Sequence, residues 1–246
     1  MITVATWNVL HRVHAENWYE DVAQRWPDEE LRIKAVTARV ASRSEQIIAL
    51  QEVSGDQLAS LRRALPGRTI HAFRYPRLPR PRRIETILSD RGEYLALLVD
   101  GPSREVVAES FANDPGKGLL AVSAFGATFI ATHVTGDRRR ASQFARLAQL
   151  STDPGGTILL GDFNRDRERI AAALGPSFTV APFESEAVPT RPRTSGAKSR
   201  FIDHVVGRAA TITDASVDNV DGLSDHNLVH ATVVTIGVGF GFGFGG

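Results

Sequence analysis

The sequence contains no cysteine and no long apolar run. Without cysteine, disulfide bonds, zinc–thiolate sites and cysteine nucleophiles are all excluded. No stretch approaches the roughly 20 apolar residues that a membrane-spanning helix needs. The first ten residues, MITVATWNVL, lack the basic start and the apolar run of a signal peptide. We therefore expect a cytoplasmic protein with no membrane partner.

Lysine is also scarce, since only three of the 29 basic residues are lysines. A GC-rich genome favours arginine codons and explains most of this bias, but it does not explain where the arginines lie. They gather in three segments in or beside predicted loops. Residues 68–84 (RTIHAFRYPRLPRPRRI) carry six arginines and no acid, residues 136–143 (GDRRRASQ) carry three in a row, and residues 191–200 (RPRTSGAKSR) carry four basic residues.

What remains is typical of a packed globular domain, with 42% hydrophobic and 23% charged residues among 246. Helical spacing of apolar residues predicts helices over 29–42, 138–150 and, less regularly, 55–65. Apolar β-forming runs predict strands over 2–9, 46–50, 94–99, 119–124, 128–132, 157–160, 201–206 and 228–235. The sequence therefore predicts one α/β domain over 1–236, followed by a Gly/Phe-rich tail over 237–246 that we expect to be mobile.

The segment TILLGDFNRD (157–166) places an acid and an amide directly after a predicted strand. In an extended chain, side chains two residues apart share one face, so Asp162 and Asn164 would point together past the end of the strand. Phe163 would then point into the core.

Other predicted strands also begin or end with polar residues. An Asp or Asn after a strand is usually a turn former, and a lone His is usually a structural residue. The recurrence at so many strand ends instead favours one shared site. The residues concerned are Asn8, Gln51, Glu52, His133, Asp203, His204, Asp225 and His226.

If Glu52, Asp162 and Asp225 lie close together in the fold, a positive charge is needed to balance their carboxylates. Two carboxylates about 4 Å apart repel by about 4 kcal/mol at an effective dielectric near 20. A divalent cation offsets this cost, and an oxygen ligand set without thiolate favours Mg²⁺ or Mn²⁺ over Zn²⁺. An acid, an amide, a cation and two histidines beside a basic rim are the parts needed to hydrolyse a phosphoester.

The motifs TWNVL, LQEV, THV, GDFN, RFIDHVV and SDH follow one another along nearly the whole chain, up to His226. In this order they resemble the endonuclease/exonuclease/phosphatase superfamily, which includes deoxyribonuclease-I-like nucleases, deadenylases and sphingomyelinases. The resemblance implies a four-layer α/β sandwich, in which two mixed sheets pack face to face with helices outside. It also implies a single catalytic pocket at the ends of the sheets.

The resemblance implies a metal site and its ligands. Glu52 corresponds to the main ligand, with Asn8 beside it and Asp225 near the metal. The cofactor would be Mg²⁺, with Mn²⁺ as a substitute, and the number of ions stays open. His204 stands where the family pattern usually has a tyrosine or another large residue, which indicates a structural role.

The resemblance also implies the catalytic residues. Asp162 would orient or deprotonate the attacking water. Asn164 and His133 would hold the phosphoryl oxygens, and His226, oriented by Asp203, would polarise the phosphate or stabilise the developing charge.

The leading hypothesis is a Mg²⁺-dependent phosphodiesterase acting on nucleic acid, with RNA or single-stranded ends favoured. Arginines interleaved with Tyr75 and prolines suit backbone phosphates and unpaired bases. Residues 7–36 resemble the opening of the deadenylase-like branch. Arg138 and Arg139 lie at the start of a predicted helix beside His133. Cations at this end of a helix oppose the helix dipole, unless a bound phosphate faces them. The two arginines are therefore candidate substrate-binding residues. The alternatives are an enzyme for a small phosphoester and a member that binds without catalysis.

Overall fold

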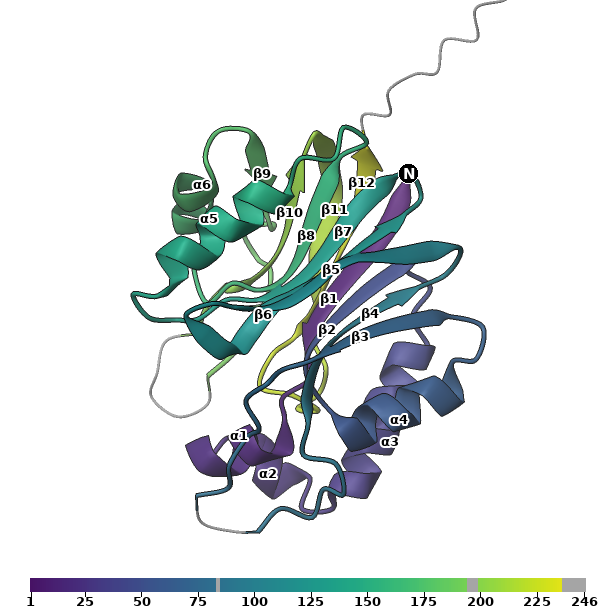
Figure 1. The fold of residues 1–246 in the computed structure, drawn as a ribbon. Coiled ribbons are helices and arrows are strands. Elements are labelled where there is room, and N and C mark those ends of the chain that lie inside the picture. The colour runs from purple at the N-terminus through teal and green to yellow at the C-terminus, as the bar shows by residue number, and fades with distance from the viewer. Residues whose placement is uncertain (83–84, 194–198, 236–246) are drawn as a thin grey trace, which may run out of the picture.

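The computed structural model describes residues 1–82, 85–193 and 199–235, which form two six-stranded sheets and six helices. The sheets pack face to face and helices cover both outer sides, so the predicted four-layer α/β sandwich is confirmed (Figure 1). The Gly/Phe-rich tail at 237–246 lies outside the described residues, and the domain boundary before it stays a prediction.

The first sheet contains the N-terminal strand and one parallel pair, β1 with β2. Its other neighbours are antiparallel. Across the sheet, the order is β11 (Ala210–Asp218), β12 (Leu228–Thr235), β1 (Ile2–Asn8), β2 (Ile47–Ser54), β4 (Glu93–Val99) and β3 (Thr69–Arg74).

The second sheet also contains one parallel pair, β7 with β8. Its other neighbours are antiparallel. Its order is β5 (Ser103–Phe111), β6 (Asp114–Ala124), β7 (Ala127–His133), β8 (Thr157–Asp162), β10 (Asp203–Arg208) and β9 (Phe178–Val180).

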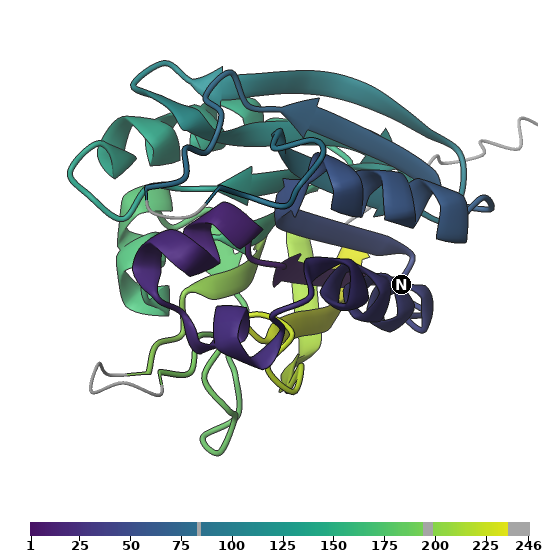
Figure 2. The same cartoon turned by 90° about the horizontal axis from the view of Figure 1, so that it is seen from below.

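The helices lie outside the sheets. Helices α3 (Glu29–Ala41) and α4 (Gly55–Ala64) cover the first sheet, and α5 (Arg140–Leu150) and α6 (Arg167–Leu174) cover the second (Figure 1). The short helices α1 (Arg12–Trp18) and α2 (Asp21–Arg25) lie together at one end of the molecule, the end seen in Figure 2. Asp28, Ser54 and Asp166 cap α3, α4 and α6 by accepting backbone N–H bonds, which fixes where these helices begin.

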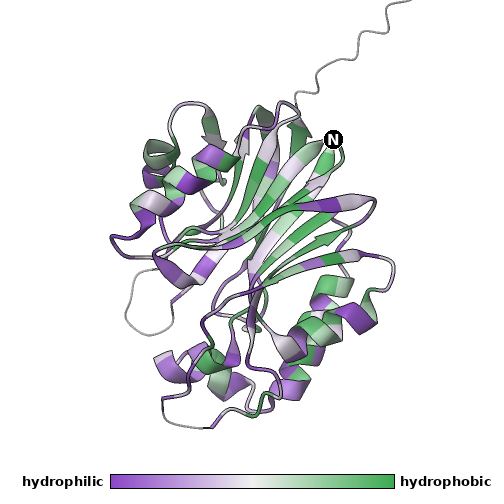
Figure 3. Ribbon diagram, in the orientation of Figure 1, coloured by the Kyte–Doolittle hydropathy of each residue, from purple (hydrophilic) through white to green (hydrophobic). Residues whose placement is uncertain are grey.

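Alternation along the strands builds three apolar cores, which appear as green strand segments in Figure 3. In β1, Ile2 and Val4 point between the sheets, whereas Ala5 and Trp7 point toward α3 and α4. A third core joins the second sheet to α5 and α6. Because both faces of the central strands are buried, these strands are mostly apolar, and most of their charged residues lie near the ends.

The eight predicted strands and the three predicted helices are all present, with shifted bounds. The strand predicted over 157–160 continues to Asp162, and the helix predicted from residue 138 begins at Arg140. The sequence did not predict β3, β5, β9 and β11, nor α1, α2 and α6. Among the described residues, no helix is long and apolar enough to cross a membrane.

Candidate active site

A cleft of about 930 Å³ opens where the polar strand ends meet. The carboxyl ends of the parallel strands β1, β2, β7 and β8 lie at this edge, together with the amino end of β10. Of the predicted site residues, Asn8 and Asp203 lie buried behind the cleft wall. Those that line the cleft are Glu52, His133, Asp162, Asn164, Asp225 and His226.

The turn after β8 places Asn164 differently from the expectation of an extended chain. Asn164 is left-handed, with φ at 52°, and its N–H donates to Asp162 Oδ1 at 2.8 Å. Its amide also donates to Val134 O at 2.9 Å. Asn164 reaches the cleft through this tight turn, whereas Asp162, the last residue of β8, follows strand alternation on the same face as Leu160. Phe163 is fully buried in the core under α5, as predicted.

Glu52 reaches the cleft because β2 bulges. The pairing of β2 with β4 shifts between Leu50 and Val53, and Glu52 itself is left-handed, with φ at 57°. A bulge of this kind redirects a side chain, and the left-handed conformation costs a non-glycine residue about 1–3 kcal/mol. The fold retains a strained residue at the position where the family pattern places the metal ligand.

Asn8 joins the two sheets at the site. Its Nδ2 donates to Glu52 Oε1 at 3.1 Å and to Asp162 Oδ2 at 3.3 Å, whereas its Oδ1 accepts from Leu10 N at 3.0 Å. The amide thus meets the two carboxylates as a donor and holds them near each other. The role of Asn8 as a metal ligand stays a prediction.

His133 lies between the same two carboxylates. Its Nε2 is 3.3 Å from Asp162 Oδ2 and 4.0 Å from Glu52 Oε1. The ammonium of Lys117, from the middle of β6, lies 3.0 Å from His133 Nδ1. Sequence reasoning missed Lys117, because a single lysine inside a strand carries no local signal of function.

His226 is held by Asp203 and by the preceding turn. His226 Nδ1 is 2.8 Å from Asp203 Oδ2, so Nε2 is directed into the cleft, 3.9 Å from Asp162 Oδ2. Ser224 donates to Asn8 O at 2.6 Å and accepts from His226 N at 3.1 Å. The SDH motif is therefore fastened to the end of β1.

The buried acids at the centre are ionised and balanced by cations. Burial acts to raise the pKa of Glu52, but His14, Lys117 and His133 together hold it well below its usual range. For Asp162, burial is likewise outweighed, mainly by His133 and then by His226, and its pKa is lowered.

His226 carries a positive charge at neutral pH. Burial alone would lower its pKa, but the carboxylates of Asp203, Asp225 and Asp162 raise it to about 10. A buried imidazolium beside an open cleft is suited to bind an anionic oxygen.

Asp225 lies on the His226 side of the cleft. Its Oδ2 is 2.7 Å from Arg191, which also binds Glu20 at 3.0 Å, and Asp225 Oδ1 is buried without a hydrogen-bond partner. The charge of Asp225 is thus already paired by Arg191. Its predicted place near a metal stays a prediction.

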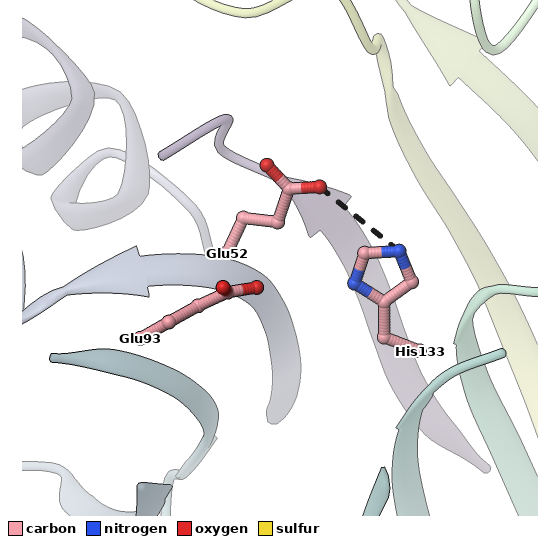
Figure 4. A group of neighbouring side chains, drawn as sticks. All are labelled: Glu52, Glu93 and His133. Carbon is pink, nitrogen blue, oxygen red and sulfur yellow. Dashed lines mark ion pairs between the residues drawn. The ribbon is translucent and has the colours of Figure 1, made fainter. Parts of the chain in front are cut away.

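The donor groups around Glu52 fit a divalent cation. Glu52, Glu93 and His133 each offer a ligand atom, and these atoms all lie within 4.8 Å of one another. Figure 4 shows the two carboxylates and the imidazole, which come from β2, β4 and β7. Glu93 Oε1 is buried without a partner, and Oε2 is 3.0 Å from His14 Nε2. No local pattern in the sequence marks Glu93 or His14.

Two of the three arginine-rich segments supply the rim of the cleft. From the first come Arg77, Arg80 and Arg82, and from the third come Arg191 and Arg193. Tyr75, which we expected to meet unpaired bases, is instead fully buried in the core between the sheets, so that prediction is wrong.

The remaining arginine segment lies apart from the residues that line the cleft. Arg139 is bound by Asp137 at 2.8 Å and by Asp114 at 3.3 Å, and Arg138 is exposed on the turn before α5. Gln143, the buried residue of this segment, accepts from Thr135 N at 2.8 Å and supports the fold. A substrate-binding role for Arg138 and Arg139 stays a prediction.

The sequence matches the profile of the Endonuclease/Exonuclease/phosphatase family over residues 5–226. A search of curated proteins finds no significant match.

Solved structures with the same fold include enzymes with different substrates. TDP2 from C. elegans is 17% identical, with a TM-score of 0.68 over 95% of this chain and 75% of that chain. D. rerio TDP2, solved with a single-strand DNA product, is 13% identical, with a TM-score of 0.67 over 95% and 99%. A mannosyl-6-phosphatase from Bacteroides thetaiotaomicron is 16% identical, with a TM-score of 0.64 over 95% and 100%.

Proposed function

The chain belongs to the endonuclease/exonuclease/phosphatase family and is a phosphoester hydrolase, and from this premise we propose that it is a Mg²⁺-dependent phosphodiesterase for single-stranded nucleic acid. The observation that carries the proposal is the arginine rim, in which Arg77, Arg80, Arg82, Arg191 and Arg193 all line the cleft, more cations than one phosphate group needs. Polynucleotides present a row of phosphates to such a rim. A cytoplasmic location stays a prediction of the sequence.

The residues of the cleft divide into three roles. Asp162, ionised and open to the cleft, accepts the proton of the attacking water or orients it. His226 donates from Nε2 to a phosphoryl oxygen, while Asp203 holds the ring in position. Asn164 and His133 bind the remaining phosphoryl oxygens.

A bound cation would be held by Glu52, with Glu93 as a further donor close to it, and His133 is left to the phosphoryl group. When bound, it would neutralise charge that develops on the phosphoryl group. Mn²⁺ is expected to substitute, because it accepts the same carboxylate oxygen ligands.

A small phosphoester, such as a nucleotide or a sugar phosphate, is the second candidate substrate. It is favoured by the structural similarity to the Bacteroides mannosyl-6-phosphatase, which extends over the whole length of that enzyme. The same rim arginines would then act as a clamp on one phosphate.

A screen of hydrolysis tests the proposal, with Mg²⁺ and single-stranded RNA, single-stranded DNA, duplex DNA and small phosphoesters as substrates. We expect the single strands to give the highest kcat/KM, with a steep loss of binding as salt increases. Asp162→Asn is the control for contaminating nucleases. Hydrolysis of small phosphoesters alone, with little salt dependence, would favour the second candidate.

A further inference from the structure

Trp18 is a large aromatic residue left open at the mouth of the cleft. It is 62% exposed, although it lines the cleft at the end of α1. The guanidinium of Arg82 lies over its ring, 5.0 Å from the centroid. We propose that Trp18 and Arg82 form a stacking site for an unpaired base that flanks the scissile phosphate. This inference rests on the proposed action on nucleic acid.

The arrangement is fixed by Asn17, so the contact of Arg82 with Trp18 is not a chance meeting of two flexible side chains. Asn17 Nδ2 donates to Arg80 O at 3.0 Å, and Arg82 N donates to Asn17 Oδ1 at 2.9 Å. These two bonds fasten the arginine segment to the last turn of α1. One helix residue thereby sets the position of both the indole and the guanidinium.

The chemistry of the pair selects a base over other ligands. An indole offers a broad apolar face, and every nucleobase has a π face that stacks on it. Arg80 and Arg82 line the same wall of the cleft and supply charge for the adjoining phosphates. A sugar phosphate offers the indole only the C–H groups of its ring and no π face, and bases inside a duplex have their faces covered.

The aromatic residue of the stacking site is not Tyr75 of the arginine segment. Tyr75 is only 1% exposed, and the exposed aromatic of the rim comes from α1 instead. The arginine segment supplies the cation and α1 supplies the ring. The stacking site is thus formed by segments more than 60 residues apart, as the Asn17 bonds show.

Binding in an inactive background tests the stacking site. Asp162→Asn protein would be titrated with a fluorescent single-stranded DNA oligonucleotide and with an abasic oligonucleotide of the same length. Adding Trp18→Ala should weaken binding of the oligonucleotide with bases by roughly tenfold, the range of one stacked base, and of the abasic one by less than about twofold. Trp18→Phe should restore part of the loss. Val106→Ala, another exposed apolar residue but one on β5 outside the cleft lining, is the matched control and should change neither.

Equal weakening of both oligonucleotides, or none in either, would overturn the stacking site. In that case hydrolysis of single strands by the native enzyme would still support the proposed function. If the native enzyme neither binds nor cleaves oligonucleotides but hydrolyses small phosphoesters, the proposed function and the stacking site both fail.

Discussion

The centre of the cleft and its rim are both polar, but they are built in opposite ways. At the centre, Asp162, His133 and His226 are at most 3% exposed and contact one another. At the rim, Arg80 and Arg82 are exposed; their backbones bind the side chain of Asn17, and the guanidinium of Arg82 lies over the ring of Trp18. Groups fixed in advance can stabilise a transition state, whereas exposed cations attract an anion and follow its shape. We therefore expect damage at the centre to lower kcat and damage at the rim to raise KM.

The largest effect is expected for Asp162→Asn. The amide cannot take a proton from water, so kcat should fall by about 10³-fold or more, while KM changes only a few-fold. Steady-state kinetics on the best substrate of the screen measures both. Asp203→Ala should give a smaller loss of kcat, because it leaves His226 in place but without its partner. A change confined to KM in both variants would contradict the catalytic assignment of the centre.

Glu52→Gln tests the metal site. The substitution removes one charge from the donor group but keeps a side chain that can accept from Asn8, so the fold should remain. We expect Mn²⁺ affinity to fall by about 100-fold, measured by calorimetry, with activity lost at low Mg²⁺. Thermal stability without metal should fall, because the cations that hold the pKa of Glu52 low lose their carboxylate partner. Unchanged Mn²⁺ affinity would place the cation elsewhere.

His204 and His226 are both fully buried near the site, but their surroundings shift their pKa values in opposite directions. His226 has three nearby carboxylates and a pKa of about 10. For His204, burial dominates and lowers the pKa from 6.5 to about 4, although Nε2 can donate to the carbonyl oxygens of Arg165 and Phe201. This agrees with the structural role predicted for His204.

The low pKa of His204 predicts acid sensitivity. The unfolded chain takes up a proton at His204 below about pH 6.5 and the folded chain only near pH 4, so the free energy of unfolding should fall as the pH drops through this interval. The loss is up to about 3 kcal/mol. His204→Phe should remove this part of the pH dependence in urea denaturation from pH 7 to pH 4. His11, whose pKa is also about 4, would keep its own part in both proteins. Identical slopes in both proteins would contradict the assignment.

The sequence predicted the centre of the fold better than its margins. The four strands that it did not predict, β3, β5, β9 and β11, are the four edge strands of the two sheets. An edge strand is partly open to solvent, so β5 (SREVVAESF) carries charged residues and lacks the apolar run of a buried strand. The helices that it did not predict are short, with seven, five and eight residues.

The site residues likewise divide into those that could be predicted from the sequence and those that could not. Asp162, His133 and Glu52 follow apolar runs and could be found from the sequence. Glu93 and Lys117 could not be found in this way, because the order of the strands in the sheets brings them to the site. Lys117, for example, reaches His133 because the neighbouring residue Gly118 pairs with His133 between β6 and β7.

Substitutions of the rim arginines should change KM and not kcat. Replacing Arg80 and Arg82 together by Gln should raise KM for a single-stranded oligonucleotide by about tenfold and leave kcat within about twofold. The slope of log affinity against log salt should become shallower by about 1.4, for two lost phosphate contacts. An unchanged salt slope would show that these arginines do not bind the phosphates of the substrate.

The smallest effect is expected from the arginines before α5. It tests whether any arginine-rich segment binds substrate, or only arginines that are not already bound by carboxylates. Arg139 is already bound by Asp137 and Asp114, and Asp114 is only 1% exposed. A phosphate would have to compete with these carboxylates for the same guanidinium. We therefore expect Arg138→Gln with Arg139→Gln to raise KM by less than about threefold and to lower the melting temperature by a few degrees, because a buried carboxylate loses a partner. Measured beside the Arg80 and Arg82 double variant at the same salt, an equal loss of oligonucleotide affinity with an unchanged melting temperature would show that this turn also binds substrate. The contrast between paired and unpaired arginines would then be wrong.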